Sequence, residues 1–432
     1  MRLAISVAAA GLALAISVTA VSTQQPIDLP EIQTAVADEG LTGGTAPEAP
    51  AGFTLTSNGF STAAEFAEAL AEFSSIETPA DGLGPMFNNV GCATCHSVPI
   101  TGGSTQVTER RAGKFDGTTF FEHPGGSLIQ DRSLNVSFQE MVAPGSNVIA
   151  LRSSLSILGD GFVEAISNTT LTNIRNAQPV AMRGLAVAVP VLEAPGQTRI
   201  GRFGHKGQQA SLLSFAADAY NNEMGITSPL QPRENGSNLT PVCVGSQVPT
   251  PSVPCVPDPL PGEPTVPDDD GDDVELFATF MRSTLAPPVD AARAATLPAA
   301  RGRSLFTSLG CATCHTATIV TAPAGTLING GAFTVHPALG NKTIHPYSDF
   351  LLHDIGTGDG IVQNGGSASR LRVRTVPLWG LRVRGRFMHD ANSHSPFDAI
   401  QRHGGEASSV RSAYNGLSAS DRDAVIVFLL SL

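Results

Sequence analysis

Apolar residues recur at helical spacing in several separate stretches of the chain. Leu212, Phe215 and Ala219 follow one another at intervals of three or four residues, which predicts a helix over residues 211–224 with one buried face. Similar stretches predict helices over residues 63–73, 274–284 and 418–432. Patterns typical of strands are few, so we expect a mainly α fold with long loops.

The first twenty residues are typical of a secretory signal. Arg2 supplies a positive start, residues 3–16 are mostly apolar, and residues 18–20 form a small-residue cleavage site. An uncleaved membrane anchor is the alternative. No later segment is long and apolar enough to cross a bilayer. We therefore expect an exported, periplasmic protein without a membrane span after cleavage of residues 1–20, and a flexible N-terminus over residues 21–50.

The charge of the chain argues against a nucleic-acid partner. The 432 residues include 26 Lys and Arg against 38 Asp and Glu, which gives a net charge of −12. Such a chain lacks the clustered cations that bind a nucleic-acid backbone. The 44 Gly and 31 Pro residues favour loops over a helical bundle. The length allows two or three domains.

Two copies of one motif carry the strongest chemical signal. Residues 92–96 and 311–315 both read Cys-Ala-Thr-Cys-His, the attachment signature of c-type haem. Two thiols one helical turn apart can form thioethers with one porphyrin, and the adjacent His then faces the iron. A zinc site would need more ligands nearby, and a thioredoxin-like pair would need a βαβ context. We therefore predict two covalent haem c groups, attached through Cys92, Cys95, Cys311 and Cys314, with His96 and His315 as iron ligands.

The two remaining cysteines are Cys243 and Cys255, in a Pro-rich loop. In an oxidising compartment such a pair usually forms a disulfide. Two free thiols are the alternative.

The haem motifs lie inside a longer internal repeat. Residues 201–205 (Gly-Arg-Phe-Gly-His) match residues 385–389 (Gly-Arg-Phe-Met-His). The match comes 109 residues after the first motif's His and 74 after the second's, so the first copy carries an insertion. Pro287 and Pro288 end the preceding helix and mark a boundary. We expect two duplicated, cytochrome c-like haem domains, an N-terminal one over residues 51–285 and a C-terminal one over residues 286–432.

The second half offers a further iron ligand. Ser395 and Pro396 start a helix that places Phe397, Ile400 and His403 on one face. Because a haem with one His needs a sixth ligand or a vacancy, we predict that His403 is the sixth ligand of the second haem. A satisfied core histidine is the alternative.

The matching helix of the first half lacks such a ligand. Ala219 stands fourteen residues after His205, where His403 stands fourteen residues after His389. Glu223 lies on the same helix face, one turn further. A carboxyl group above an open haem could act as the general acid and base in peroxide cleavage. A capping or salt-bridged Glu is the alternative.

Together these motifs resemble the bacterial di-haem oxidoreductases, which are relatives of the di-haem cytochrome c peroxidases and of the di-haem enzymes that oxidise protein tryptophans. The matching stretches are residues 82–87 with 92–96, 159–166, 201–206, 222–228, 346–349 with 352–354, 377–380, 388–390 and 403–406. The resemblance covers the chain from about residue 80 to the end.

The resemblance implies that the C-terminal haem relays electrons and that the N-terminal haem reacts with peroxide. His403 falls where the relatives carry a Met or Tyr ligand, and Glu223 falls where they carry the acid/base Glu. His205 falls where they often carry a Trp between the haems, so Glu223 and His205 are our catalytic candidates. Ala112 stands where some relatives have a distal His, which leaves His123 as the nearest substitute.

Several other residues have weaker interpretations. Glu164 is a second acid candidate or a loop carboxylate, and Arg152 could bind a haem propionate or a surface anion. His353 and His389 are expected to be structural or to lie near a propionate. The acidic run over residues 268–273 could bind Ca²⁺, as some relatives do between domains, or form a solvated loop.

We expect an exported di-haem c-type oxidoreductase that reduces hydrogen peroxide with electrons from a small redox protein, such as a cytochrome or a cupredoxin. One alternative is a pure electron-transfer cytochrome in which both irons are six-coordinate. Another is an oxidase that acts on a protein or organic substrate through a high-valent haem.

Overall fold

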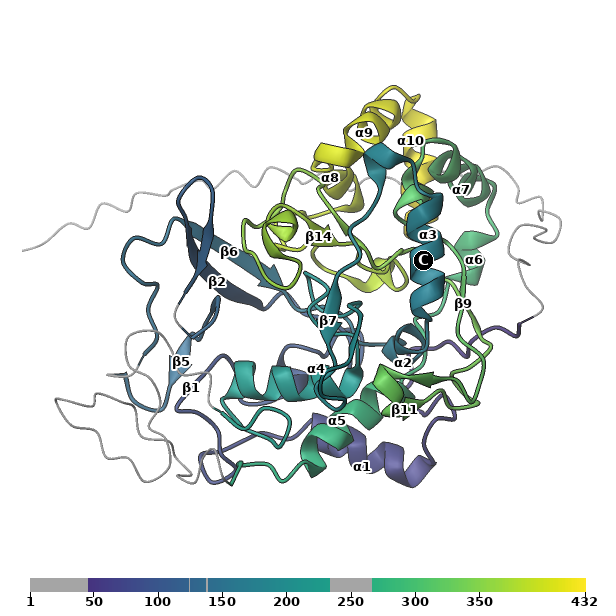
Figure 1. Cartoon of the computed structure of the whole chain (residues 1–432). Helices are drawn as coiled ribbons and strands as arrows, with labels where there is room; N and C mark the ends of the chain where they lie inside the picture. The colour runs from purple at the N-terminus through teal and green to yellow at the C-terminus, as the bar shows by residue number, and fades with distance from the viewer. Residues whose placement is uncertain (1–45, 124, 137–138, 234–265) are drawn as a thin grey trace, which may run out of the picture. The chain divides into compact units, whose positions relative to one another are not determined.

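Most of the chain from residue 46 onward is described. The computed structural model describes residues 46–432 except 124, 137–138 and 234–265, and these described residues belong to a single compact unit (Figure 1). The expected signal and the Cys243–Cys255 disulfide lie outside them. No helix in the described ranges is both long and apolar enough to cross a membrane.

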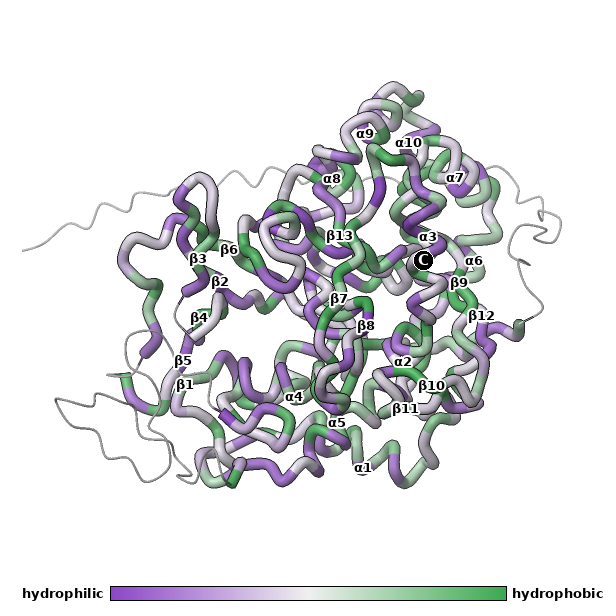
Figure 2. The backbone as a smooth tube through the Cα atoms, in the orientation of Figure 1, coloured by the Kyte–Doolittle hydropathy of each residue, from purple (hydrophilic) through white to green (hydrophobic). Residues whose placement is uncertain are grey.

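The fold is mixed α/β, so the prediction of a mainly α fold is wrong. The described residues form ten α-helices and several small sheets. Among the described strands, all except β2 (Thr108–Phe115) and β6 (Val148–Ser153) have only two or three residues. Such short strands leave no alternating pattern that a sequence could reveal. Figure 2 accordingly shows short hydrophobic segments interleaved with hydrophilic ones along the chain.

One hydrophobic core is built around α1 (Ala63–Phe73), α4 (Leu212–Ala219) and α5 (Asp272–Ser283). The predicted helix over residues 63–73 is confirmed, and a capping box at its start satisfies backbone N–H groups. Phe73 and Phe280 pack with ring centroids 4.5 Å apart. This core supports the side of the molecule that carries the first Cys-x-x-Cys-His motif.

A second core joins α7 (Leu297–Ser308) to α10 (Ala419–Leu429). Gly302 allows their close approach, because a Cβ there would lie 2.0 Å from the carbonyl oxygen of Ala424. Since α7 ends just before Cys311, this helix pair fixes the position of the second motif.

The insertion in the first copy contains the largest of the described sheets. β2 lies at its centre and pairs antiparallel with β3 (Phe120–Glu122), β4 (Leu128–Ile129) and β6. The register places Glu109 of β2 opposite Arg152 of β6. The sheet thus presents charged side chains to the interior of the molecule.

The internal repeat is visible in the local backbone. An antiparallel bridge joins Phe203 to Gln209 in the first copy and Phe387 to Ser393 in the second. In each copy a serine-capped helix follows, α4 in the first and α8 (Pro396–Gln401) in the second. The proposed division into two haem domains stays a prediction.

The remaining elements connect these parts. They are β1 (Met86–Phe87) with β5 (Arg132–Ser133), α2 (Asp160–Glu164), α3 (Asn168–Ala177), β7 (Ala188–Pro190) with β8 (Thr198–Ile200), α6 (Ala291–Ala294), β9 (Ile319–Val320) with β12 (Thr343–Ile344), β10 (Leu327–Ile328) with β11 (Phe333–Thr334), β13 (Leu352–His353) with β14 (Val373–Arg374), and α9 (Ser408–Asn415).

Candidate haem sites

Both Cys-x-x-Cys-His motifs adopt the same local structure. Each forms a single 3₁₀ turn, over Cys92–Thr94 and over Cys311–Thr313. The backbone N–H of His96 donates to Cys92 O (3.1 Å), and that of His315 donates to Cys311 O (3.0 Å). Each motif therefore keeps its two thiols and its imidazole on one compact turn, as attachment to one porphyrin requires.

The two motif histidines are oriented by backbone carbonyls. Nδ1 of His96 lies 3.2 Å from Gly103 O, and Nδ1 of His315 lies 3.0 Å from Tyr347 O. A carbonyl oxygen only accepts, so Nδ1 carries the hydrogen in each ring. Nε2 is then the unprotonated nitrogen, which is the one free to bind a metal.

The structure brings His403 to His315. Nδ1 of His403 lies 2.8 Å from Ala399 O, which again leaves Nε2 free. The ring centroids of His315 and His403 are 6.5 Å apart. Because a metal–imidazole bond is about 2 Å long, this separation leaves room for one metal ion between the two rings.

A cavity of about 540 Å³ surrounds these two histidines. Its volume lies in the usual range for cofactor pockets. The wall includes Cys311 and Cys314 together with apolar side chains such as Phe306. The donor set and the space therefore fit a haem group held by both thiols.

The charged side chains in this wall are all cationic. They are Arg374, Arg384, Arg386, Arg411 and the protonated His353, and no carboxylate of the described residues lines the wall. Arg384 is half-buried and donates to Pro377 O at 2.6 Å, and burial followed by the charge of Arg374 lowers its pKa to about 10. A haem carries two propionates, which would balance such cations. Arg152, our sequence candidate for this role, is instead paired with Asp359 at 2.8 Å.

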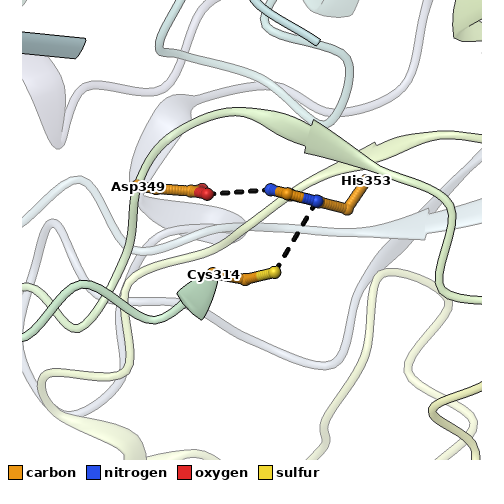
Figure 3. Close-up of side chains that lie close together, drawn as sticks. All are labelled: Cys314, Asp349 and His353. Atoms are coloured by element: carbon orange, nitrogen blue, oxygen red, sulfur yellow. Dashed lines mark hydrogen bonds and ion pairs between the residues drawn. The ribbon is translucent and has the colours of Figure 1, made fainter. Parts of the chain in front are cut away.

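Cys314 contacts a buried cluster of charged side chains that includes His353 and Asp349 (Figure 3). Nε2 of His353 lies 2.8 Å from Asp349, and Nδ1 lies 2.7 Å from Glu406 and 3.6 Å from Cys314 Sγ. Burial alone would lower the pKa of His353, but its hydrogen bonds to Asp349, Cys314 and Glu406 raise it to about 12. The ligand atoms of Cys314, Asp349 and His353 lie within 4.8 Å of one another. A protonated imidazole is a poor metal ligand, so we interpret the cluster as structural.

Glu223 lies beside the first motif. The helix α4 ends at Ala219, and the chain continues as one π-helical turn, Tyr220–Met224, of a kind frequent at functional sites. Asn88 donates its side-chain N–H to Glu223 Oε2 at 2.7 Å, and the neighbouring Asn89 Nδ2 lies 3.7 Å from Cys95 Sγ. The adjacent asparagines thus place Glu223 near the thiols.

The surroundings of Glu223 favour its protonated form. Burial raises its pKa, the nearby carboxylate of Glu109 raises it further, and Arg111 opposes the shift. Burial would also raise the pKa of Glu109, but the charge and hydrogen bonds of Arg111, and the charge of Arg152, lower it. Sequence reasoning missed Glu109 and Arg111, whose only sequence signal is their two-residue spacing.

His205 occupies a different place from Glu223. Its Nε2 lies 2.8 Å from Ser153 O, and the backbone N–H of Ser153 donates to His389 O at 2.8 Å. Burial and the charge of Arg152 lower the pKa of His205 to about 3. The ring is therefore neutral, and it shares Ser153 with the repeat-equivalent His389, whose side chain borders the C-terminal cavity.

Glu164 has a structural role. It is fully buried, and it accepts from Arg282 at 2.7 and 3.1 Å, from Asn329 at 3.0 Å and from the backbone N–H of Leu212 at 2.8 Å. These contacts tie α2 to α5 and satisfy the start of α4. A carboxylate saturated in this way is not available for proton transfer, which leaves Glu223 as the acid candidate.

Two weaker candidates also have structural contacts. The backbone N–H of Ala143 donates to His123 Nε2 at 2.9 Å. Asp268 accepts from Thr227, and Asp269 accepts from the N–H of Gly271 at the start of α5. Among the described residues, the carboxylates of the 268–273 run do not converge in a group of three. Ca²⁺ binding there stays a prediction from the resemblance.

Two solved structures show weak similarity to the chain. Hydrazine synthase from Kuenenia stuttgartiensis is 14% identical with a TM-score of 0.40, over 94% of this chain and 100% of that chain. A MauG-like protein associated with microbial copper homeostasis is 16% identical with a TM-score of 0.24, over 38% of this chain and 57% of that chain. These scores are too low to carry an inference. A comparison with curated proteins found no match.

One protein family matches most of the chain. The family described as "Di-haem oxidoreductase, putative peroxidase" matches residues 137–432. The matched region includes Glu223, the second Cys-x-x-Cys-His motif and His403, while the first motif precedes it. The cofactors of this family are haem groups, in agreement with the donor sets described above. The chain therefore belongs to the di-haem oxidoreductase family.

Proposed function

We propose that the chain is an exported di-haem c-type oxidoreductase that reduces hydrogen peroxide with electrons from a small redox protein. The observation that carries the proposal is the difference between its two sites. One site pairs His315 with His403, whereas the other places a half-buried carboxyl group, Glu223, beside Cys95. The secretory signal predicted in residues 1–20 supports the exported location in this proposal.

Four thiols and three imidazoles would hold the cofactors. Cys92 and Cys95 would attach the first haem and Cys311 and Cys314 the second, with the imidazoles of His96, His315 and His403 toward iron. When bound, the two irons would supply the electron transfer and the centre at which peroxide reacts. Two imidazole ligands at the C-terminal site favour electron relay, because they leave no open position.

Glu223 would handle the protons of the reaction. Reduction of one hydrogen peroxide to two waters consumes two electrons, from two donor molecules, and two protons. Asn88 donates to Oε2 of Glu223, which leaves Oε1 to hold a proton near neutral pH. Oε1 would donate this proton to the departing peroxide oxygen, and the resulting carboxylate would accept the next proton from water.

The charge distribution favours an acidic electron donor at the C-terminal half. Residues 286–432 contain 13 Lys and Arg against 9 Asp and Glu, whereas residues 1–285 contain 13 against 29. The half that carries the relay site is thus net positive in a chain of net charge −12. An acidic cytochrome or cupredoxin would be steered to this half and away from the other.

Anaerobic turnover tests the proposal. The haem-loaded protein is mixed with hydrogen peroxide and a reduced small cytochrome of acidic pI, with a basic cytochrome as the matched control. We expect two donor molecules oxidised per peroxide, and faster turnover with the acidic donor at low salt than at high salt. A protein that accepts electrons but consumes no peroxide would contradict the proposal and would indicate an electron carrier.

A further inference from the structure

Glu109 is held by a bidentate ion pair. Its Oε1 lies 2.7 Å from Arg111 Nε, and its Oε2 accepts from Arg111 Nη2 at 2.9 Å. Arg152, on the neighbouring strand β6, lies 4.0 Å from Oε1. Two guanidinium groups therefore face this carboxylate from the sheet, an arrangement that strongly favours its ionised form.

Glu223 reaches the same carboxylate from the other side. A side-chain hydrogen bond between Glu109 and Glu223 contributes to the pKa of both groups, raising that of Glu223 and lowering that of Glu109. Two ionised carboxylates cannot hydrogen-bond, so one proton must lie between them. Glu223 has a neutral partner in Asn88, whereas the cation Arg111 contacts Glu109. The proton consequently belongs on Glu223.

We propose that Glu109 is a positioning residue that shares one proton with Glu223, and that Arg111 keeps this proton on Glu223. The inference rests on the proposed role of Glu223 in peroxide reduction. The shared proton explains why the carboxyl group of Glu223 would stay protonated at neutral pH, as its proposed role as an acid requires.

The other charged groups around the pair act mainly through Arg111. Asp218, from α4, favours the charged form of Arg111, and its own pKa is raised by burial. Arg152 is paired chiefly with Asp359, at 2.7 Å. Cys95 faces both carboxyl groups, and as a thioether it would carry no charge. The position of the proton between Glu109 and Glu223 therefore depends mainly on Arg111, which lies on β2 together with Glu109.

The pairing also explains how the proton would return. Once Glu223 has donated its proton to a peroxide oxygen, two carboxylates face each other. Their repulsion raises the proton affinity of Glu223, so it recovers a proton from water before the next turnover. Glu109 itself stays ionised throughout and touches no reacting atom.

Two substitutions with opposite expected effects test the inference. Glu109→Gln removes the negative charge, and its amide can donate to a Glu223 carboxylate, so we expect the proton affinity of Glu223 to fall at least tenfold. Arg111→Gln removes the cation, so the proton affinity of the pair should rise at least tenfold. Glu68→Gln, at an exposed site on α1, is the control. Haem content checks that each variant is folded.

The readout is the protonated-carboxyl infrared band of the resting ferric protein, followed against pH, which needs no turnover. A midpoint that moves to lower pH in Glu109→Gln and to higher pH in Arg111→Gln supports the shared proton. Glu109→Asp, which keeps the charge, should retain more of the native midpoint than Glu109→Gln. Midpoints that do not move, or that move in the same direction, overturn the inference. If the midpoints move as expected but the native protein consumes no peroxide, the pairing stands and the proposed function fails.

Discussion

The two haem sites differ most in the helix that follows the repeated Gly-Arg-Phe motif. In the C-terminal site the short α8 ends at Gln401, and the ring of His403 lies 6.5 Å from that of His315, centroid to centroid. In the N-terminal site α4 continues into a π-helical turn, which carries Glu223 to Asn88. In our proposal, the repeat therefore presents an iron ligand, His403, in one copy and a proton donor, Glu223, in the other.

The charged groups around the two sites also differ. Among the described residues, the wall of the C-terminal cavity contains four arginines and no carboxylate, and Cys314 contacts the His353 cluster. The N-terminal site has a pair of carboxyl groups instead, with Arg111 bound to one of them. The first environment favours the binding of an anionic cofactor, and the second favours a protonated carboxyl group. Our proposal accordingly assigns electron relay and proton transfer to different halves.

Removing one pair of attachment thiols should have the largest effect. A double Cys-to-Ala change at Cys92 and Cys95, or at Cys311 and Cys314, should halve the haem content of the purified protein, because each pair attaches one porphyrin. Haem quantified against protein measures this. Unchanged haem content in either double variant would contradict covalent attachment at that motif.

The loss of Glu223 should lower peroxide turnover strongly. Glu223→Gln keeps the size of the side chain but cannot donate a proton, so we expect a loss of about 10²–10⁴-fold. In the native protein the rate should fall as pH rises through the raised pKa of Glu223, because only the protonated carboxyl donates. Steady-state kinetics against pH measure both effects. Glu68→Gln is the control, and equal rates in both variants would rule out Glu223 as the acid.

Replacement of His403 should affect only the C-terminal site. His403→Met exchanges a bis-His haem for a His/Met haem, which raises the reduction potential. Spectroelectrochemical titration should show one shifted and one unshifted haem. A variant with two native potentials would mean that His403 does not bind iron.

The His353 cluster should contribute to stability. His353→Asn leaves Asp349 and Glu406 without their shared cation, which should lower the free energy of unfolding by about 3–5 kcal/mol. Because the folded pKa of His353 is raised to about 12, this stabilisation is complete below the ordinary His pKa of about 6.5 and is lost as pH rises through about 12.

Urea unfolding of the haem-loaded protein measures the effect. His345→Asn, which removes a more exposed His–Glu pair with Glu48, is the matched control and should change stability by no more than about 1 kcal/mol. Equal losses in the two variants would contradict a special role for the cluster.

The smallest effect should come from the cationic wall. Arg384→Gln removes a half-buried positive charge, so the ferric state should be favoured and the C-terminal reduction potential should fall. Arg301→Gln, at an exposed ion pair with Asp421, is the control and should leave the potential unchanged. A rise in the Arg384→Gln potential would contradict a haem group near this residue.

The features that could be predicted from the sequence are those that depend on residues only a few positions apart. The two Cys-x-x-Cys-His motifs and the helix Ala63–Phe73 depend on neighbouring residues, and both were predicted directly. The fold class was wrong because most strands are two or three residues long. The family was also recognised from its motifs, and the match over residues 137–432 confirms it.

Side-chain partners across long sequence separations could not be predicted. The sequence leaves Glu164 as a second acid candidate, because it does not show that Arg282, 118 residues later, is paired with it. The two-residue spacing of Glu109 and Arg111 was too weak a signal to single out Glu109, because its proposed role depends on Glu223, more than a hundred residues away. Such contacts depend on packing, which a single sequence does not specify.

Low-temperature EPR of the ferric protein, with and without hydrogen peroxide, tests the asymmetry of the two sites most directly. We expect one low-spin signal from the His315/His403 site and one high-spin signal from the His96 site, with peroxide changing the high-spin signal. Two low-spin signals that peroxide leaves unchanged, even after one-electron reduction, would contradict a division between an electron-relay site and a peroxide-reacting site.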